Sequence, residues 1–371
     1  MHLTRLQFAR LRCFDEVALE ALEAGVVLFT GANGAGKTSV LEAVHLLGYG
    51  RSFRGRVRDG LIRSGAADLQ VYAEWRGGND GRLHRAGLQH AGRHWAARLD
   101  GEAVATLADL CAAFAVVTFE PGSHELIAGG AEHRRRFLDW ALFHVEPTFL
   151  PVWRRFARAL KQRNALLKSG PVPAALEPWD RELGEAGEQL TRLRLGFLDC
   201  LRPALVETAD EFLPELGTAD LGFHPGWRRE ELPLHDALVL SRERDLLLGH
   251  TTVGPQRADW QVRYAGLPGR ESLSRGQEKL TALACVLAQA REFARARGEW
   301  PVICLDDLAS ELDRPHQEQV LRVLLSSGAQ VLLTGTDPPP ALRALDAPAQ
   351  WFHVEQRRVF PRPPAQVGGA L

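Results

Sequence analysis

Hydrophobic and polar residues alternate along the first part of the chain in the manner of half-buried strands. The stretches HLTRLQF and VALEAL, and later LQVYAEW and RHWAARLDG, show this period of two. The Gly/Asn/Asp-rich stretch GGNDG between the last two is typical of a turn. GVVLFT, at residues 25–30, is a continuous apolar run, the pattern of a strand buried on both faces. We therefore expect strands and hairpins around one helix up to about residue 95.

The periodicity changes further along the chain. Residues 131–212 lack β-branched runs, and prolines at positions 147, 151, 171, 173, 178 and 203 are expected to divide this arginine-rich stretch into several helices. Later, PVICLDD and QVLLTGTD look like buried strands, with the helical HQEQVLRVLL between them. The pattern predicts an α/β domain formed by residues 1–124 and 250–371, with a mainly helical domain of residues 125–249 inserted.

Composition excludes several classes of protein. The 371 residues include 45 basic and 46 acidic side chains, so any nucleic-acid site must be a local patch. The five cysteines are scattered and none forms a C-x-x-C pair, which argues against a disulfide framework and a zinc site. No stretch approaches the roughly 18 apolar residues of a membrane span, and the N-terminus lacks the apolar core of a signal peptide. We expect a cytoplasmic protein with no membrane partner.

The strongest motif is GANGAGKT, which matches the P-loop pattern G-x-x-x-x-G-K-[ST] and follows the buried strand of residues 25–30. Its glycines let the backbone N–H groups surround phosphate oxygens, and the N-terminus of the following helix adds positive charge. Lys37 is one of only four lysines and suits the β- and γ-phosphates, while the Thr38 hydroxyl suits Mg²⁺. The predicted ATP site comprises Gly31, Ala32, Asn33, Gly34, Ala35, Gly36, Lys37 and Thr38.

A second motif, VICLDDLASELD, ends a predicted buried strand in two carboxylates. In P-loop NTPases an acidic residue at this place holds Mg²⁺, a role that we assign to Asp306 together with Thr38. Asp307 would then orient or deprotonate the attacking water. The alternative is that these acids only favour the N-terminal turn of a helix.

The third motif, LSRGQEKL, contains a capping box with Ser274 at the N-cap and Gln277 three residues later. Capping explains both residues, but it does not explain Gly276, which weakens a first helical turn. A serine hydroxyl, bare glycine amides and a helix N-terminus together form an anion site. A γ-phosphate held elsewhere is therefore a candidate ligand.

In combination, these motifs resemble those of ABC-type ATPases, in which LSRGQEK corresponds to the signature motif. The order GANGAGKT, helical insertion, LSRGQEK, LDDLASELD resembles the SMC-like branch, which acts on DNA. More narrowly, YGRSFR, VTFEPGSHELIAGGAEHRRRFLDW, TTVGPQRAD and the Asp306–Asp307 pair resemble the RecF family of bacterial recombinational repair. The resemblance covers essentially the whole chain and implies an ABC/SMC-like P-loop ATPase head, with residues 125–249 as its lobe II.

Two short stretches depart from the family pattern. Where the family reads Gly-Pro-His-Arg-Asp, this chain has Gln256 and Ala258 in the third and fifth places. Where a proline-glutamate-aspartate run is expected, the chain reads Pro-Gly-Ser-His-Glu at residues 121–125. After the last core strand the chain has TGTD, whereas transporter-type ABC ATPases carry a histidine there.

The resemblance implies a mechanism and partners. Ser274, Gly276 and Gln277 would contact the γ-phosphate of ATP held by a second copy, so ATP and Mg²⁺ would join a homodimer and weak, DNA-stimulated hydrolysis would release it. The family binds single-stranded and gapped DNA and junctions, and it acts with RecO and RecR in loading RecA. The same resemblance implies roles in DNA repair and replication and in support of the SOS response.

Basic clusters are candidates for DNA contacts. The first comprises Arg51, Arg54, Arg56, Arg58 and Arg63. The second is Arg134–Arg136, and the third comprises Arg154, Arg155, Arg158, Lys161 and Arg163. A solvated helix face is the more common explanation of any one such cluster, and the second is also compatible with a structural brace between the two domains.

Two other functions are compatible with the motifs. One is an SMC-like ATPase head with a different partner, although such heads usually carry long coiled-coil arms for which the insertion is too short. The other is a nucleotide-switched adaptor that recruits proteins and hydrolyses little ATP.

Overall fold

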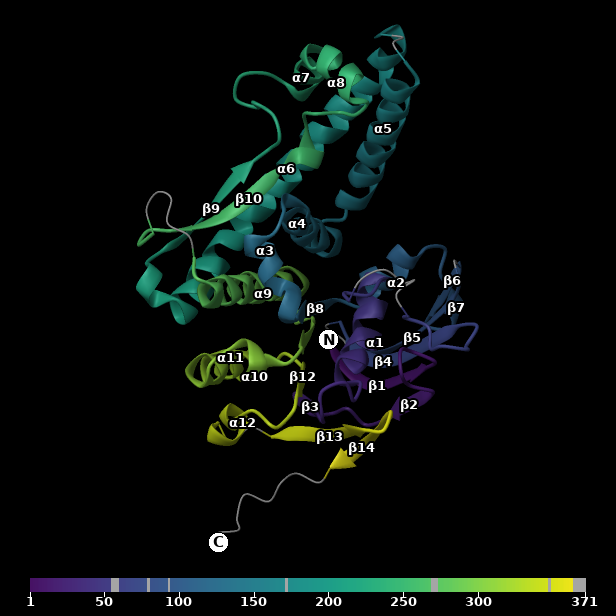
Figure 1. The fold of residues 1–371 in the computed structure, drawn as a ribbon, viewed down its shortest axis with the longest axis vertical. Helices are drawn as coiled ribbons and strands as arrows, with labels where there is room; N and C mark the ends of the chain where they lie inside the picture. The colour runs from purple at the N-terminus through teal and green to yellow at the C-terminus, as the bar shows by residue number, and fades with distance from the viewer. Residues whose placement is uncertain are drawn as a thin grey trace. The chain divides into compact units, whose positions relative to one another are not determined.

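The computed structural model describes residues 1–54, 60–78, 81–92, 94–170, 173–267, 273–345 and 348–362. The chain divides into two compact units, and each is described by itself. Unit 1 comprises residues 1–123 and 293–371, and unit 2 comprises residues 124–292 (Figure 1). The first division lies within one residue of the predicted boundary. Residues 250–292 group with unit 2, and their assignment to an ATPase domain stays a prediction.

Unit 1 contains an antiparallel six-stranded sheet with the order β2-β1-β4-β5-β6-β7. Its strands are β1 (His2–Ala9), β2 (Glu16–Leu19), β4 (Leu69–Gly77), β5 (Arg82–Ala91), β6 (His94–Leu99) and β7 (Glu102–Ala103). The expected alternation is present in β4, where Leu69, Val71, Ala73 and Trp75 are buried and the residues between them are not. β5 was missed from the sequence because RLHRAGLQHA has no β-branched residue and contains a glycine.

The second sheet of unit 1 has the order β14-β13-β3-β12-β11-β8. Its strands are β3 (Val26–Thr30), β8 (Val116–Phe119), β11 (Val302–Leu305), β12 (Val331–Gly335), β13 (Ala349–Glu355) and β14 (Arg358–Arg362). Strands β13, β3, β12, β11 and β8 run parallel, and β14 joins β13 as an antiparallel edge. All residues of β3, β11 and β12 are buried, as the continuous apolar runs predicted.

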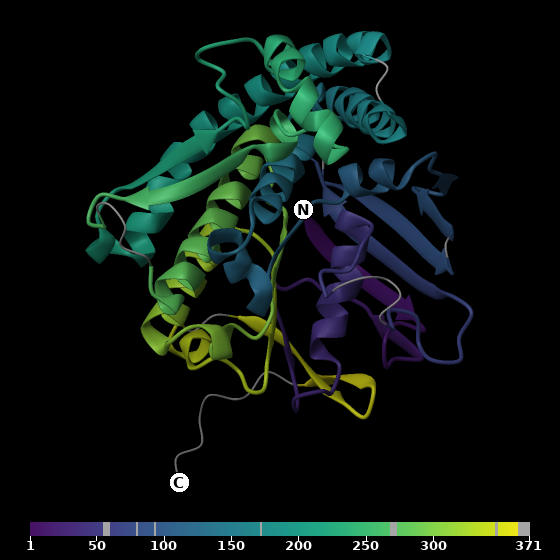
Figure 2. The same cartoon turned by 45° about the horizontal axis from the view of Figure 1, so that its top comes forward.

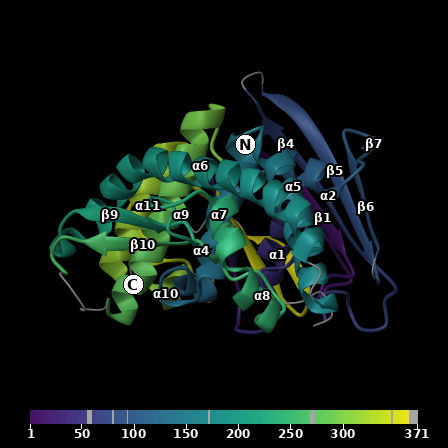
Figure 3. The ribbon, with the colours of Figure 1, turned by 90° about the horizontal axis from the view of Figure 1, so that it is seen from above.

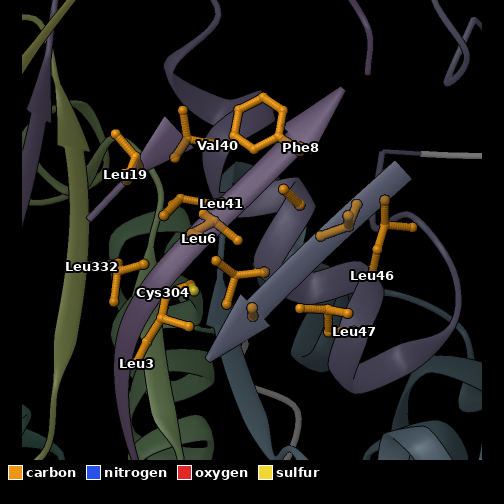
Figure 4. Packing of buried hydrophobic residues seen from close by; sticks show 14 of the residues in the cluster. Leu3, Leu6, Phe8, Leu19, Val40, Leu41, Leu46, Leu47, Cys304 and Leu332 are labelled. Atoms are coloured by element: carbon orange, nitrogen blue, oxygen red, sulfur yellow. The ribbon is translucent and has the colours of Figure 1, made fainter. Parts of the chain in front are cut away.

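Helix α1 (Lys37–Tyr49) contributes to one core together with strands of both sheets. Its Val40, Leu41, Val44 and Leu47 are fully buried, as the helical spacing predicted. Figure 4 shows part of this core, in which Leu41, Leu46 and Leu47 of α1 and Leu3 and Leu6 of β1 share one cluster with Cys304 and Leu332. This packing fixes the start of α1 at the carboxyl end of β3. The other α-helices that lie wholly in unit 1 are α2 (Leu107–Ala113), α10 (Leu308–Glu311), α11 (Arg314–Ser327) and α12 (Pro340–Ala344).

Unit 2 is mainly helical, as expected, with a two-stranded antiparallel ribbon. Its helices are α3 (Glu125–Ala128), α4 (Ala131–Val145), α5 (Phe149–Ser169), α6 (Pro173–Phe212), α7 (Leu234–Leu240), α8 (Arg242–Leu248) and the first eighteen residues of α9 (Arg275–Arg297). The ribbon pairs β9 (Ala219–His224) with β10 (Asp259–Tyr264). Figures 2 and 3 show α5 running alongside the long α6, and the two helices are in contact.

The expectation that every proline divides this region into separate helices was wrong at two positions. Pro178 and Pro203 lie inside α6, which continues through both for 40 residues. Each proline removes one backbone hydrogen bond, but contacts of α6 with α4, α5 and α7 outweigh that local cost.

Two expectations from composition are met. All five cysteines are unpaired. Across the described ranges, no helix has the length and apolar character needed to cross a membrane.

Candidate functional site

The P-loop connects β3 to α1 through backbone conformations that require glycine. At Gly31, a Cβ atom would lie 2.2 Å from the carbonyl oxygen of Val354 in the neighbouring β13. Gly36 has φ 111°, and a Cβ there would lie 2.6 Å from ring carbons of Phe14. Both contacts are too short for any side chain, so the loop can follow this path only with these glycines. Ala32, Asn33 and Gly34, at the tip of the loop, are exposed.

The N-terminus of α1 is an unneutralised positive end. Gly36 at the N-cap provides no side-chain hydrogen bond, and the first turn contains no acidic residue. The Lys37 ammonium is buried and donates to the carbonyl oxygens of Gly31 at 2.9 Å and Ala32 at 3.0 Å. The loop thus combines free helix N–H groups with a fixed cation, which is the arrangement that binds phosphate groups.

Asp306 lies beside the P-loop, at the carboxyl end of β11, which is separated from β3 by β12 in the sheet. Its Oδ1 accepts hydrogen bonds from Thr38 Oγ1 at 3.0 Å and from Thr334 Oγ1 at 2.6 Å. Burial raises the pKa of Asp306, and the two threonine hydrogen bonds oppose that shift. Hydroxyl and carboxylate oxygens are the ligands that Mg²⁺ prefers, so Thr38 and Asp306 fit the predicted metal role. Residues 268 positions apart in sequence are in direct contact here.

Thr334 was missed by the sequence analysis. It ends the buried part of β12, in the TGTD stretch, and its hydroxyl contacts both acids of the pair. Its position in the sequence could have identified it, because it ends a buried strand as Asp306 does. The strands β11 and β12 are parallel neighbours, so polar residues at their carboxyl ends meet at one sheet edge.

Asp307 has a strained backbone that turns it away from β11. Its φ of 51° places it in the left-handed region, and it is the N-cap of α10. Its N–H donates to Thr334 Oγ1 at 2.9 Å, whereas no hydrogen bond or ion pair of the described residues engages its half-buried carboxylate. A carboxylate left without such partners beside a phosphate site can accept a proton or orient a water molecule.

The turn that starts α9 has the predicted capping box. The N–H of Ser274 donates to Gln277 Oε1 at 2.9 Å, and the N–H of Gln277 donates to Ser274 Oγ at 3.4 Å. Ser274, Arg275 and Gly276 are exposed, and a Cβ at Gly276 would have no atom within 4 Å. Neither crowding nor a positive φ within the chain explains this glycine. The turn belongs to unit 2 and the P-loop to unit 1.

The first basic cluster is only partly described. Arg56 and Arg58 lie outside the described residues. Arg51 and Arg54 are exposed, and Arg63 forms an ion pair with Asp15. Burial raises the pKa of Asp306, and the positive charge of Arg54 slightly opposes that rise.

The segment that carries Arg54 is attached to α1 through a buried carboxylate. Arg12 holds Glu42 of α1 with two hydrogen bonds of 2.9 and 2.7 Å, and Ser52 also donates to Glu42. Ser52 Oγ in turn accepts from the N–H of Arg54 at 2.9 Å. Glu42 is fully buried, so this chain of contacts is a fixed part of the P-loop helix.

Much of the second and third clusters serves the structure of unit 2. Arg134 holds Asp259 at 2.6 and 3.1 Å and also the carbonyl groups of residues 126, 127 and 129. Arg135 donates to the carbonyl of Ala258 at 2.8 Å. These contacts join α4 to β10 within unit 2, and a brace between the two domains stays a prediction. In the third cluster, Arg163 is fully buried, and Arg155 pairs with Glu182 and Glu185.

The fold and the geometry of this site define an ABC-type P-loop ATPase related to SMC heads. A family model described as RecF/RecN/SMC N terminal domain matches residues 2–358. The DNA replication and repair protein RecF of Xanthomonas axonopodis pv. citri (strain 306) is 60% identical over 362 residues, covering 97% of this chain and 98% of that protein. The chain belongs to the RecF family of DNA replication and repair proteins.

Further relatives and solved structures agree with this assignment. RecF of Stenotrophomonas maltophilia (strain R551-3) is 57% identical over 98% of this chain and 100% of its own length. The solved recombination mediator protein RecF-ATP in the RecFOR pathway superposes with a TM-score of 0.87 at 26% identity, with 98% of each chain covered. An SmcHead bound to the C-winged helix domain of ScpA has a TM-score of 0.60 at 14% identity over 99% of each chain, and it shares the fold.

Proposed function

We propose that this chain is an ATP-driven clamp for DNA in which two copies enclose two ATP molecules across a two-fold axis. The observation that carries the proposal is the turn at Ser274, Gly276 and Gln277, which is capped, exposed and open around its glycine. The hydroxyl and amide groups of this turn can donate to an anion. The described residues around the turn do not supply that anion. In a symmetric dimer, the P-loop of one copy supplies that anion to the other.

ATP binding would use the groups already assembled at the P-loop. The amides of residues 31–38 and the N-terminus of α1 would hold the phosphates, and Lys37 would leave the carbonyls of Gly31 and Ala32 for the β- and γ-phosphates. Thr38 and Asp306 would hold Mg²⁺, which neutralises phosphate charge. RecF relatives solved with ATP support this cofactor assignment.

Hydrolysis in this proposal is a switch that releases the clamp. Asp307 orients or deprotonates the attacking water, and loss of the γ-phosphate removes the ligand of the partner's signature turn. Turnover is slow and rises on DNA. Residues 1–124 with 250–371 act as the ATPase domain, and residues 125–249 act as lobe II.

The DNA substrate and partners follow from the family. The proposed targets are single-stranded and gapped DNA and junctions, where the clamp acts with RecO and RecR to load RecA and supports SOS induction. The name of the solved relatives, a recombination mediator protein in the RecFOR pathway, supports this assignment. Arg51, Arg54, Arg56, Arg58 and Arg63 are the proposed DNA contacts of unit 1.

The mass of the protein in solution tests the clamp. Light scattering is expected to show a dimer with ATP and Mg²⁺ and a monomer with ADP or no nucleotide. Lys37→Met should remain monomeric because it cannot hold the phosphates. Ser274→Arg should bind ATP normally and also remain monomeric, because only the contact with the second copy is blocked. A wild-type mass that does not depend on nucleotide would refute the clamp.

Single-turnover hydrolysis tests the role of Asp307 and separates the ATPase from an adaptor. Asp307→Asn is expected to keep ATP-dependent dimerisation, lose hydrolysis and dissociate slowly from gapped DNA. If the wild-type dimer also fails to hydrolyse ATP within a single turnover on gapped DNA, the adaptor function replaces the ATPase.

A further inference from the structure

A hollow of about 730 Å³ lies within unit 2, along one face of α5. It is lined by side chains of α4, α5 and α6 and by Gln256. The polar and aromatic members that matter here are Arg135, Trp153, Lys161, Asn164, Lys168 and Arg194. None of them belongs to the P-loop, the Asp pair or the signature turn.

Trp153 presents an aromatic surface at one end of this hollow. Its residue is 40% exposed, although most large hydrophobic side chains of the described structure are buried. It shares the lining of the hollow with the carboxylate of Asp139 in α4. An exposed indole on a long helix is a suitable platform for stacking a planar group.

The charge of the hollow is predominantly positive. Lys161 and Lys168 are exposed, and they are two of only four lysines in the chain. Arg135 adds a further cation, and the lining also contains Arg194 and the acids Glu132 and Asp139. Both acids are already neutralised by ion pairs, Glu132 with Arg136 and Asp139 with Arg194 at 2.8 Å.

Other cations of α5 are committed to structural contacts. Arg155 pairs with Glu182 and Glu185 of α6 at 2.7 and 2.6 Å, and Arg163 is buried between Asp180 and Asp245. By contrast, neither Lys161 nor Lys168 forms an ion pair with any described residue. Lys161 and Lys168 are two helical turns apart, about 10 Å along the axis, and Trp153 lies two turns before Lys161.

Asn164 adds a preorganised polar group between the two lysines. Its Oδ1 accepts hydrogen bonds from the N–H and the hydroxyl of Thr251 at 2.8 and 2.7 Å. Because these bonds fix the orientation of the amide, its NH₂ group is left as a donor with no hydrogen-bond acceptor among the described residues.

We infer that this face of α5 binds single-stranded nucleic acid, with one base stacked on Trp153 and the backbone phosphates paired with Lys161 and Lys168. Stacking on aromatic rings combined with a positive groove is the usual means of binding single strands without sequence preference. A duplex keeps its bases paired and cannot offer one to the indole. The inference rests on the proposed function, to which it adds a site for the single-stranded part of the DNA.

Binding of a fluorescein-labelled oligothymidine of about twelve nucleotides, measured by fluorescence anisotropy, tests the site. Trp153→Ala is expected to weaken binding about tenfold without changing its dependence on salt, because a stacking contact carries no charge. Trp153→Phe should retain most of the affinity. Neither change should affect the binding of a blunt duplex of the same length.

The lysines are tested by the salt dependence itself. The double variant Lys161→Gln and Lys168→Gln is expected to reduce the slope of log K against log salt by about 1.4, or about 0.7 for each phosphate that no longer has a lysine beside it. Replacement of both lysines by arginine should restore the slope. Arg228→Gln is the matched control, since Arg228 is an 80% exposed cation of the same unit outside the hollow.

Some results would overturn the inference. Unchanged oligothymidine affinity in Trp153→Ala, or a slope reduced equally by Arg228→Gln, would show that the strand binds elsewhere. Displacement of the oligothymidine by a polyglutamate peptide whose own binding requires Trp153 would identify the hollow as a protein site.

Failure of this site and failure of the clamp have different signatures. The variants above are expected to form ATP-dependent dimers like the wild type, because they leave the P-loop and signature turn intact. A variant that loses oligothymidine binding but keeps the normal dimer mass would bear only on the site in the hollow and not on the clamp. A wild type that binds the strand at Trp153 but never dimerises would refute only the clamp.

Discussion

The charge of Asp306 is destabilising for the folded chain in the absence of ligand. Burial raises its pKa above the ordinary value, so the folded state binds a proton more readily than the unfolded state. The cost is absent below the unfolded pKa and fully present above the folded pKa. At neutral pH the charged carboxylate therefore does not stabilise the fold, as expected of a residue proposed to hold Mg²⁺.

Asp306→Asn is expected to raise the unfolding temperature of the nucleotide-free protein at neutral pH. Its amide oxygen can still accept from Thr38 and Thr334, while the buried charge is removed. The gain should shrink as the pH falls toward the unfolded pKa of aspartate, and ATP-dependent dimerisation should be lost. Asp313→Asn, at the exposed N-cap of α11 where asparagine is an equally good cap, should change neither. A lower unfolding temperature for Asp306→Asn would contradict this account.

Among individual residues, those that belong to a local sequence motif were predictable from the sequence. The P-loop, the capping box and the Asp pair are each readable within about a dozen positions. Sequence analysis missed Thr334, and it missed the ion pair of Arg12 with Glu42, because such partners are distant in sequence and meet only after the sheets form. The roles assigned to the site residues stay predictions.

Arg163 shows how a helix face changes the meaning of a charge. It was grouped with neighbouring cations, yet it follows Val152, Phe156 and Ala159 on the buried face of α5. The guanidinium donates to Asp180 and to Asp245 at 2.6 Å each, and all three side chains have no exposed surface. Helical spacing alone would have identified it as inward-facing.

Arg163→Ala is expected to destabilise unit 2 by about 3–5 kcal/mol, because it leaves the buried Asp245 without its cation and Asp180 with only Arg242. Urea unfolding followed by circular dichroism would measure the change. Arg155→Ala on the same helix removes a partly exposed pair and should cost only about 0–1 kcal/mol. Equal losses of unfolding free energy in the two variants would show that the buried ion pairs of Arg163 stabilise the fold no more than the exposed ones of Arg155.

The prolines of α6 show why element boundaries were harder to predict. Local propensity ends a helix at Pro178 and Pro203, but packing along a 40-residue helix carries the backbone through both. Strands β5 and β9 were missed for the related reason that each is defined by its pairing partner, β4 or β10, more than by its own composition.

Pro203→Ala is expected to stabilise the protein by about 1–3 kcal/mol, since Pro203 is an exposed residue inside a helix. Pro147 is also exposed but lies between α4 and α5, so Pro147→Ala should destabilise the protein. The substitution only gives the unfolded chain more conformational freedom, which should lower the free energy of unfolding by about 0.4–1 kcal/mol. Thermal unfolding of the two variants side by side would show the difference in sign. A loss of stability in Pro203→Ala would mean that the packing of α6 depends on this proline.

For the whole molecule, the order of motifs predicted the class of ATPase and the strand-rich and helical parts of the chain. The dimer stays a prediction, because its formation depends on a ligand and on a second copy of the chain. What the single chain shows is an open capped turn in unit 2 and a P-loop in unit 1, which we propose are the two halves of one phosphate site. Substitutions distributed over two different chains can reveal whether these halves join between copies.

Mixed dimers of differently tagged chains provide this test directly. If the signature acts on the ATP of the other copy, a chain with Lys37→Met paired with a chain with Ser274→Arg retains one complete site, formed by the P-loop of the second and the signature of the first. A chain with both substitutions paired with a wild-type chain retains none, although the same two substitutions are present. We therefore expect ATP-dependent mixed dimers, detected by co-purification of both tags, only in the first pairing. If the signature acted within its own chain, the result would be reversed, because the wild-type partner would keep a complete site and the two single variants would have none.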